Sequence, residues 1–361
     1  MLLFGTSICA NAQEGFGVYG IALGAQNNES APSIDSLAAV ENIINEKPDF
    51  EIVAEKITDN KAILSWHSSE AFLVFTINKF NIITMQWEEY TTTNECRAEI
   101  TGLLENTQYS FSVSNSATGE ELGIITFTTG VKKAEVIVKN RTSKQVELQI
   151  EHPASATEVY LYKSKNGKNF SLLADVTGRS YVDTDVKEAT AYYYKAKCVS
   201  RRGNTVKKSE FSKVTKAVTL KNLGKPSVDG TTKTYAYYTA GTARRSPQYK
   251  LLHSEECYTD EETGIRMVDG FYCVALGSYY GTKIGTKYKI TLEGGKEINV
   301  ILCDQKSNRH TDSKHQYARR NKDVVEFYVE KRRIPAGVRG DYGRLEQFSG
   351  KIVSIEKYVE D

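Results

Sequence analysis

The residues best suited to chemistry gather in one short stretch, directly after a predicted strand at Asn299–Cys303. Polar and charged side chains follow at close spacing: Asp304, Lys306, Asn308, Arg309, His310, Asp312 and His315. A strand that ends in such a loop lets a rigid scaffold present a site. No upstream part of the sequence is as dense in reactive side chains, so the candidate site is placed here.

Asp304 is the strongest candidate for an acid or base. Cleavage of a glycosidic bond needs a carboxylic acid held protonated near the leaving oxygen, and burial at a strand end raises a carboxyl pKa in that direction. The alternative for Asp304 is a surface residue that caps a turn.

The same loop offers two further kinds of chemistry. His310, Asp312 and His315 are binding candidates, and two imidazoles with a carboxylate would also suit zinc. The alternative is that these are solvated loop side chains. Cys303 and His310 together supply a nucleophile and a base, although a thiol within a strand is also expected to be buried. We assign no metal and no cofactor.

The preceding stretch, Phe271–Ile290, contains the elements that must position this loop. Its first part, FYCVAL, is an apolar strand, and a glycine-rich turn follows it. The second strand shows period-two alternation at Tyr288 and Ile290, and glycine at the breaks is typical of strands joined by turns. Tyr279 and Tyr280, in the turn, are further binding candidates.

The order of these segments resembles that of the small double-psi β-barrels of cell-wall enzymes. The segments concerned are Val274–Gly277, Ile284–Ile290, the strand before Asp304, and Val324–Phe327. The resemblance covers roughly the last third of the chain. It is to the three-aspartate domain of lytic transglycosylase-like proteins and, more distantly, to the barrel of rare lipoprotein A and expansins.

The three aspartate positions of that family are kept in part. Asp304 matches the second aspartate, but Gln305–Ser307 replace the Thr-Gly-Gly that follows it. Leu276-Gly277 replace the first aspartate, and Glu326 stands at the third position. The resemblance implies a barrel that binds or remodels cell-wall glycan, with Asp304 and Glu326 at its catalytic positions.

Composition limits the class of protein. A chain of 361 residues is long enough for two or three domains. Lys+Arg 47 against Asp+Glu 45 gives a net charge of +2, which argues against a general nucleic-acid binder. Abundant tyrosine (22) and scarce proline (6) favour an all-β chain. No apolar run approaches the roughly 20 residues that span a bilayer.

The N-terminus and the cysteines bear on the compartment. Met1–Ala12 resembles a shortened signal peptide that ends in a small-x-small pattern, and a buried N-terminal strand is the alternative. Cleavage would remove Cys9 and leave an odd number of cysteines without Cys-x-x-Cys spacing, which indicates neither zinc nor a dense disulfide framework. Cys273 and Cys303 can form a disulfide only if their strands are adjacent.

Residues 49–130 show the pattern of a β-sandwich. Ala62–Trp66 alternates in polarity, and Tyr109, Phe111 and Val113 alternate after a turn. This is similar to fibronectin type III, in which an early Trp fills the core and a tyrosine corner hydrogen-bonds across a loop. Ala71–Trp87 is unusually apolar and its strands are not assigned. It belongs to the core or, where exposed, is a contact surface.

Residues 131–220 repeat this scheme and also resemble fibronectin type III. Val146–Ile150 and Val159–Tyr162 are early strands, and Asn166-Gly167 marks a hairpin turn. Alternation through Tyr192–Tyr194 predicts that one face of this strand lies in the core, although tyrosines in a row could also stack on carbohydrate. Two such units in tandem form an internal repeat, typical of spacers and adhesive modules.

Together these patterns predict an all-β chain of two immunoglobulin-like (fibronectin type III) sandwiches and a C-terminal six-stranded double-psi-like β-barrel. The expected segments are a signal-peptide remnant (1–12), a linker (13–48), the sandwiches (49–130 and 131–220), a second linker (221–233) and the barrel (234–361).

The expected function is that of a secreted or surface-associated bacterial protein that binds or remodels cell-wall glycan through its barrel, with the sandwiches as spacers. The expected partner is cell-wall glycan or another surface polysaccharide, and the sandwiches could contact a protein. Neither nucleic acid nor a membrane span is expected. The alternative is a non-catalytic surface or phage-associated adhesion protein, so enzymatic activity stays open.

Overall fold

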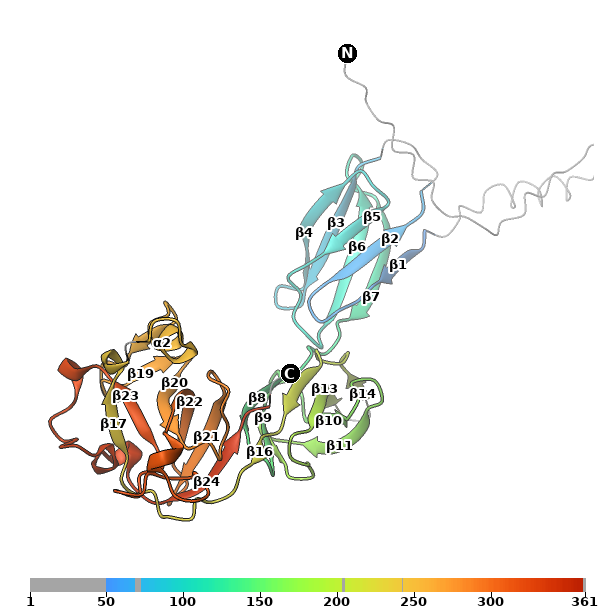
Figure 1. The fold of residues 1–361 in the computed structure, drawn as a ribbon. Helices are drawn as coiled ribbons and strands as arrows, with labels where there is room; N and C mark the ends of the chain where they lie inside the picture. Colours follow the sequence, from blue (N-terminus) through green and yellow to red (C-terminus); the bar gives the residue numbers. More distant parts are fainter. Residues whose placement is uncertain (1–49, 69–72, 203–204, 242, 360–361) are drawn as a thin grey trace, which may run out of the picture. The chain divides into compact units, whose positions relative to one another are not determined.

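The computed structural model describes residues 50–359 apart from 69–72, 203–204 and 242, so the expected signal-peptide remnant and first linker lie outside the described residues. Regular structure is almost entirely β-strand (Figure 1), which confirms the all-β prediction. The short helical segments are η1 (Tyr238–Ala240), α2 (Pro247–Leu252), η2 (Asn308–His310), η3 (Lys331–Arg333), η4 (Tyr342–Arg344) and η5 (Glu346–Phe348). No helix in the described ranges is long and apolar enough to cross a membrane.

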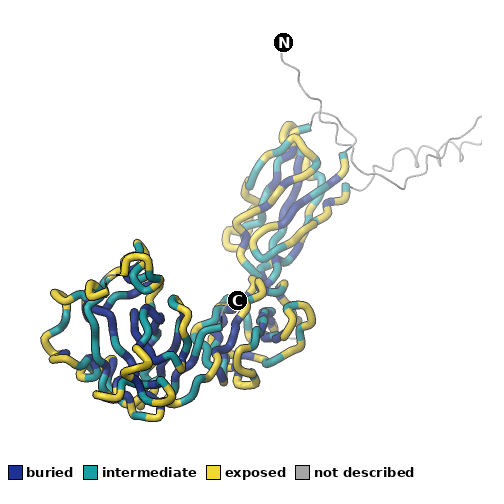
Figure 2. Tube along the Cα trace, viewed as in Figure 1, coloured by how far each residue is buried: buried dark blue, intermediate teal, exposed yellow. Residues whose placement is uncertain are grey.

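The described chain forms two compact units. The first contains the described residues up to Ala134 and those within His152–Val159 and Lys197–Phe211. The second contains Glu135–Glu151, Tyr160–Ala196 and the chain from Ser212 onward. Buried residues concentrate on the strands of each sheet (Figure 2).

The first sandwich has a three-stranded and a four-stranded antiparallel sheet. In spatial order these are β1 (Ile52–Glu55), β2 (Ala62–Trp66) and β5 (Arg97–Ile100), and β4 (Gln86–Thr93), β3 (Phe75–Asn81), β6 (Gln108–Asn115) and β7 (Glu121–Thr128). On β5 the side chains alternate between core and solvent, with Ala98 and Ile100 buried, as a period of two requires. Trp66 is 7% exposed and meets the Phe75 ring edge-on at 5.3 Å between centroids, which confirms its predicted core position.

The unassigned apolar stretch divides between core and surface. Phe75 and Ile77, on β3, are buried, whereas the turn that joins β3 to the edge strand β4 exposes Ile82 by 79%, Ile83 by 89% and Met85 by 68%. The side chain of Asn81 fixes this turn by accepting from the backbone N–H of Ile83 at 2.9 Å. The described part of this stretch is therefore core on β3 and exposed in the turn, and a contact role for the exposed part stays a prediction.

The second sandwich has the same two-sheet plan. Its sheets are β12 (Ser180–Asp183), β9 (Val146–Glu151) and β8 (Glu135–Arg141), and β11 (Ser171–Val176), β10 (Glu158–Ser164), β13 (Ala191–Arg202), β14 (Thr205–Lys208) and β15 (Thr215–Val218). Tyr192 and Tyr194 are buried, which confirms the core reading of this strand. The predicted hairpin turn joins β10 to β11, with Gly167 at a positive φ of 70°.

Both sandwiches contain a tyrosine corner. The Tyr109 hydroxyl accepts the backbone N–H of Leu104 at 2.8 Å, and the Tyr192 hydroxyl accepts that of Lys187 at 2.8 Å. In each case the tyrosine closes a loop that begins five residues upstream, as in immunoglobulin-like sandwiches. With the core Trp66 and the two-sheet arrangement, this confirms the predicted fibronectin type III-like architecture.

The C-terminal part is one mixed nine-stranded sheet. Its main path is β16 (Lys221–Asn222), β24 (Ile352–Lys357), β21 (Lys287–Leu292), β22 (Glu297–Gln305), β20 (Phe271–Leu276), β19 (Arg266–Val268) and β18 (Cys257–Thr259), and β20 also pairs β23 (Glu326–Val329), which pairs β17 (Thr234–Tyr237). Among the described strands no pairing closes this sheet into a barrel. The double-psi barrel therefore stays a prediction.

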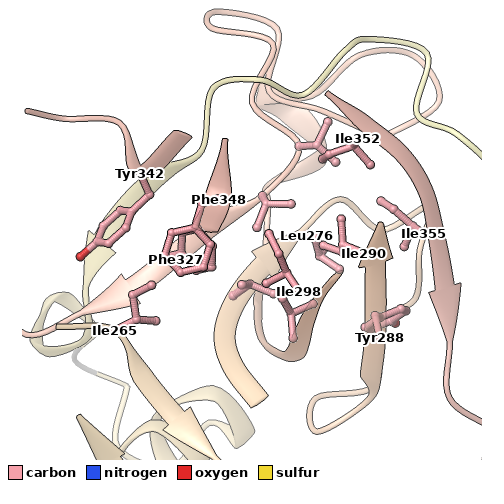
Figure 3. Close-up of a cluster of buried hydrophobic side chains, with 14 of the residues drawn as sticks. Ile265, Leu276, Tyr288, Ile290, Ile298, Phe327, Tyr342, Phe348, Ile352 and Ile355 are labelled. Atoms are coloured by element: carbon pink, nitrogen blue, oxygen red, sulfur yellow. The ribbon is translucent and has the colours of Figure 1, made fainter. Parts of the chain in front are cut away.

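Strand β20 is buried on both faces, which explains its unbroken apolar sequence. Val274 and Leu276 face the main core, where Phe327, Tyr342 and Phe348 pack together (Figure 3). Cys273 and Ala275 face a second cluster, which contains Tyr328 and is closed by Leu252 from α2. The strand is thus fixed from both sides, and its C-terminal end is a rigid platform.

The segment predicted to be the second linker is part of this sheet. β16 pairs with β24, the backbone N–H of Leu223 donates to Ile355 at 2.9 Å, and that of Ile352 donates to Asp229 at 2.8 Å. Lys233 is fully buried, and its ammonium donates to three backbone carbonyls. Residues 221–233 are therefore held along an edge strand by backbone hydrogen bonds.

Candidate functional site

Asp304 and Glu326 lie on either side of one residue because three neighbouring strands share a register. β20 pairs in parallel with β22 and antiparallel with β23, so that Ala275 lies opposite Asp304 on one side and Glu326 on the other. Directly paired residues project from the same face of a sheet. The two carboxylates therefore flank Ala275 on one face, at the C-terminal end of β20.

A β-bulge in β22 produces this arrangement. Val274 pairs with Leu302 but Ala275 pairs with Asp304, so Cys303 is the extra residue. With strict alternation Cys303 would lie opposite Ala275, and Asp304 would project toward the main core that holds Val274 and Leu302. The bulge thus moves Asp304 to the face that carries Glu326.

The Asp304 carboxylate is already an acceptor on both oxygens. The Tyr328 hydroxyl donates to Oδ2 in a short contact, and the backbone N–H of Gln305 donates to Oδ1 at 2.8 Å. Burial, followed by the bond to Asp304, raises the pKa of Tyr328 above its ordinary value, so this phenol stays a donor. The hydrogen bond between Tyr328 and Asp304 fixes the position of the Tyr328 ring, and Asp304 itself is half-buried.

Glu326 borders a buried ion pair. The Lys306 ammonium donates to Asp323 Oδ2 at 2.9 Å and lies 3.7 Å from Glu326 Oε2, and the Thr234 hydroxyl also donates to Asp323. The Asp323 side chain is 1% exposed, and its Oδ1 has no partner among the described residues. Burial raises the pKa of Asp323, against the opposing effect of Lys306.

The loop after β22 is organised by Asp312. Its carboxylate accepts backbone N–H groups of Lys314 at 2.9 Å, Gln316 at 2.6 Å and Tyr317 at 3.0 Å. Partial burial acts to raise the pKa of Asp312, but these N–H groups outweigh it and hold the pKa below its ordinary value. Asp312 therefore shapes the loop from within.

The two histidines of this loop differ in environment. His315 has a positive φ of 57°, and its Nδ1 lies 2.9 Å from the Thr311 hydroxyl. His310, at the end of η2, is exposed. Within the described part of the chain no three His, Cys, Asp or Glu side chains gather as a metal site would require. The zinc alternative for His310, Asp312 and His315 thus finds no support in the geometry.

The turn after β20 supports this loop. The backbone N–H of Tyr279 donates to the His315 carbonyl at 3.3 Å, and a Cβ on Gly277 would lie 1.9 Å from that same oxygen. Only glycine allows so close an approach. Tyr280 is buried beneath the turn, whereas the Tyr279 ring is 49% exposed and packs edge-on against Tyr280 at 5.1 Å.

The cysteines of the C-terminal sheet are buried thiols. The strands of Cys273 and Cys303 are adjacent, but neither residue forms a disulfide. The Cys257 and Cys273 sulfurs lie 4.0 Å apart, and the hydrogen bond between them, followed by burial, raises the pKa of Cys257. Cys303 is fully buried while His310 is exposed, so the nucleophile alternative finds no support either.

Two members of this site were missed from the sequence, namely Tyr328 and Asp323. Tyr328 follows Glu326 by two positions, so strand alternation would have placed it on the same face. Asp323 directly precedes the apolar Val324–Phe327 segment, which is the usual place for a strand-end polar residue. Their partners, Asp304 and Lys306, lie on another strand, and only the pairing of strands brings them together.

Comparison with known proteins finds similar solved structures but no matching family. No protein-family model matches the chain, and no curated protein matches it. Among solved structures, a two fibronectin type-III domain segment from chicken tenascin is similar at 13% identity and a TM-score of 0.32, covering 47% of this chain and 98% of its own. Selenomethionine-substituted chicken interferon gamma receptor alpha chain is similar at 9% identity and a TM-score of 0.33, covering 47% of this chain and 96% of its own.

Proposed function

We propose that this chain is a modular binding protein of the bacterial surface, secreted or surface-associated, whose C-terminal sheet binds cell-wall glycan. The observation that carries the proposal is the register around Ala275, which brings Asp304 and Glu326 to either side of that residue at the end of one strand. The half-exposed Tyr279 ring lies on the turn that follows this strand. Carboxylates bind sugar hydroxyls, and an aromatic face stacks on a sugar ring.

The site suits binding better than acid catalysis. Both Asp304 oxygens accept hydrogen bonds from the protein, whereas a general acid must offer a proton to the leaving oxygen of its substrate. Glu326 lies 3.7 Å from the Lys306 ammonium, so it already has a charged partner. The two sandwiches then serve as spacers, a role in keeping with compact modules that have their own cores.

Glycan remodelling is the second candidate, because two carboxylates on one face are the minimum for glycoside cleavage. Across two strand spacings their Cα atoms lie about 10 Å apart. Inverting enzymes hold their carboxyl groups at about 6.5–9.5 Å, with a water between. Asp304 and Glu326 would act as the acid and base in such a reaction. A third possibility, a phage-associated adhesion protein, would use the same face without turnover.

One experiment separates these functions. The full chain and its variants are mixed with purified peptidoglycan, and bound protein and released soluble fragments are measured together. Tyr279→Ala should weaken binding by about 3–10-fold, the value of one stacked aromatic ring. Tyr258→Ala is the matched control, because Tyr258 is also 49% exposed but lies on β18. Asp304→Asn should weaken binding with no release from either protein.

Two results would contradict the binding proposal. If the wild type releases soluble fragments and Asp304→Asn lowers that release by about 10²–10⁴, the remodelling function is correct instead. If peptidoglycan binding is absent, or equal in Tyr279→Ala and wild type, the sheet end does not bind wall glycan.

A further inference from the structure

A second site lies where β8 approaches β21 and β22, inside the second compact unit. It is a cavity of about 510 Å³, and its lining is almost wholly polar: Asn140, Arg141, Lys289, Glu297, Asn299 and Tyr358. Small-molecule sites have volumes of about 300–1,000 Å³. A polar cavity of this size suits a hydrated ligand that carries many hydroxyl groups.

The floor of this cavity is a closed hydrogen-bond network. Lys289 is 2% exposed, and its ammonium donates to Glu297 at 2.9 Å and to Asn140 in a short contact. The Asn140 amide in turn donates to Glu297 at 3.2 Å. Glu297 is the only acid that lines the cavity, and this network neutralises it. An anionic ligand would therefore meet no uncompensated negative charge there.

The rim, in contrast, offers unused donors. The Arg141 guanidinium lies over the Tyr358 ring at 5.5 Å and has no carboxylate partner among the described residues. The Tyr358 hydroxyl donates to Asn299 Oδ1 at 3.1 Å, while the Asn299 amide nitrogen donates to no described residue. A guanidinium held by an aromatic ring is a preformed fork for a planar anion.

The scaffold around the rim is itself fixed. Glu356 is buried and accepts both the backbone N–H of Ser143 at 2.8 Å and the Ser143 hydroxyl. Ser143 follows Arg141 by two residues, and Glu356 precedes Tyr358 by two. These bonds therefore hold both walls of the cavity in place, and binding would need little reorganisation.

We propose that this cavity binds an acidic sugar, with the sugar carboxylate on Arg141 and a sugar hydroxyl group on the Asn299 amide. This rests on the proposed function, since it names an acidic component of a surface polysaccharide as the ligand of a second subsite. A sugar phosphate shares the same chemistry of one anionic group on a polyol, and the test below distinguishes the two.

The test is calorimetric titration of the full chain with three probes: glucuronate, glucose 6-phosphate and neutral glucose. Glucuronate should bind to the wild type at least about tenfold more tightly than glucose does. Arg141→Gln should lower the affinity for glucuronate by about tenfold, as expected for the loss of one charged hydrogen-bonding partner. Asn299→Ala should weaken the binding of glucuronate and of glucose to a similar extent. Arg179→Gln is the matched control, because Arg179 is exposed on the same sandwich and away from the cavity.

The remaining outcomes overturn the proposal. Binding of glucose 6-phosphate alone would exclude the carboxylate, and equal glucuronate binding by wild type and Arg141→Gln would exclude the cavity. No heat with any probe would exclude both. The wall-binding proposal is tested separately, by comparing peptidoglycan binding of Tyr279→Ala and wild type. If that proposal fails, the cavity can still bind glucuronate.

Discussion

Two buried lysines of the C-terminal sheet are held by different kinds of acceptor. Lys306 faces the Asp323 carboxylate, whereas Lys233 donates only to three backbone carbonyls at 3.0 to 3.2 Å. Carbonyls carry no net charge, so they offset the loss of hydration less than a carboxylate does. Burial lowers the pKa of Lys233 to about 8, although nearby carboxylates act to raise it.

This difference predicts a pH effect on stability. An unfolded lysine has a pKa of about 10.4, so between about pH 8 and 10.4 the unfolded chain binds more protons than the folded one. Stability should therefore rise with pH through this window, and it should level off at its lower value below the folded pKa, where both states are protonated. Relative to Lys233→Met, the free energy of unfolding of the wild type should increase by up to about 3 kcal/mol.

Denaturant unfolding of both proteins at pH 7.5, 9 and 10 measures this, because the other titrating groups cancel in the difference. The variant should be less stable throughout, since it leaves three carbonyls without a donor. A difference between the two proteins that does not change with pH would show that Lys233 stays charged across the window.

Among the elements, those with strict alternation were predictable and those fixed by backbone pairing were not. The β2 strand and the Tyr192–Tyr194 strand follow from side-chain period alone. β4 was not assigned because the side chains of an edge strand need not alternate between polar and apolar. The bulge at Cys303 and the pairing of residues 221–223 cannot be predicted from side-chain polarity, because backbone N–H and C=O groups form the hydrogen bonds that define both features.

The same limit applies to the candidate site. Asp304 and Glu326 were predicted as a pair, from the strand before the first and from a family resemblance. Their partners Tyr328, Lys306 and Asp323 depend on which strands lie together, and long-range register is not readable from one local pattern. The sequence therefore identified acids without showing that both already have partners.

Residues 221–233 should contribute to the stability of the C-terminal sheet, because they make backbone hydrogen bonds to it. A fragment beginning at Lys221 should fold, whereas one beginning at Thr234 loses β16, the Leu223–Ile355 bond and the buried Lys233. At about 1 kcal/mol for each net hydrogen bond, the shorter fragment should be less stable by at least about 3 kcal/mol. Thermal unfolding followed by circular dichroism compares them, and equal midpoints would show that residues 221–233 are a linker after all.

At the scale of the molecule, the first sandwich has a core of its own. Its buried cluster contains Trp66, Phe75 and Phe111 and only residues between 50 and 127, while the main core of the C-terminal sheet is built from residues beyond 222. Separate cores joined by a continuous chain are expected to unfold separately. Damage to the first sandwich should therefore leave the candidate site intact.

The two tryptophans of the chain test this independence. Trp66 is 7% exposed and Trp87 is 38% exposed, so Trp66→Ala should destabilise the first sandwich by about 3–5 kcal/mol through loss of a core aromatic. Trp87→Ala, the matched control on the edge strand β4, should cost far less. Scanning calorimetry of Trp66→Ala should show one transition lowered and the others unmoved, with peptidoglycan binding unchanged. If binding falls together with that transition, the first sandwich carries part of the binding surface and is more than a spacer.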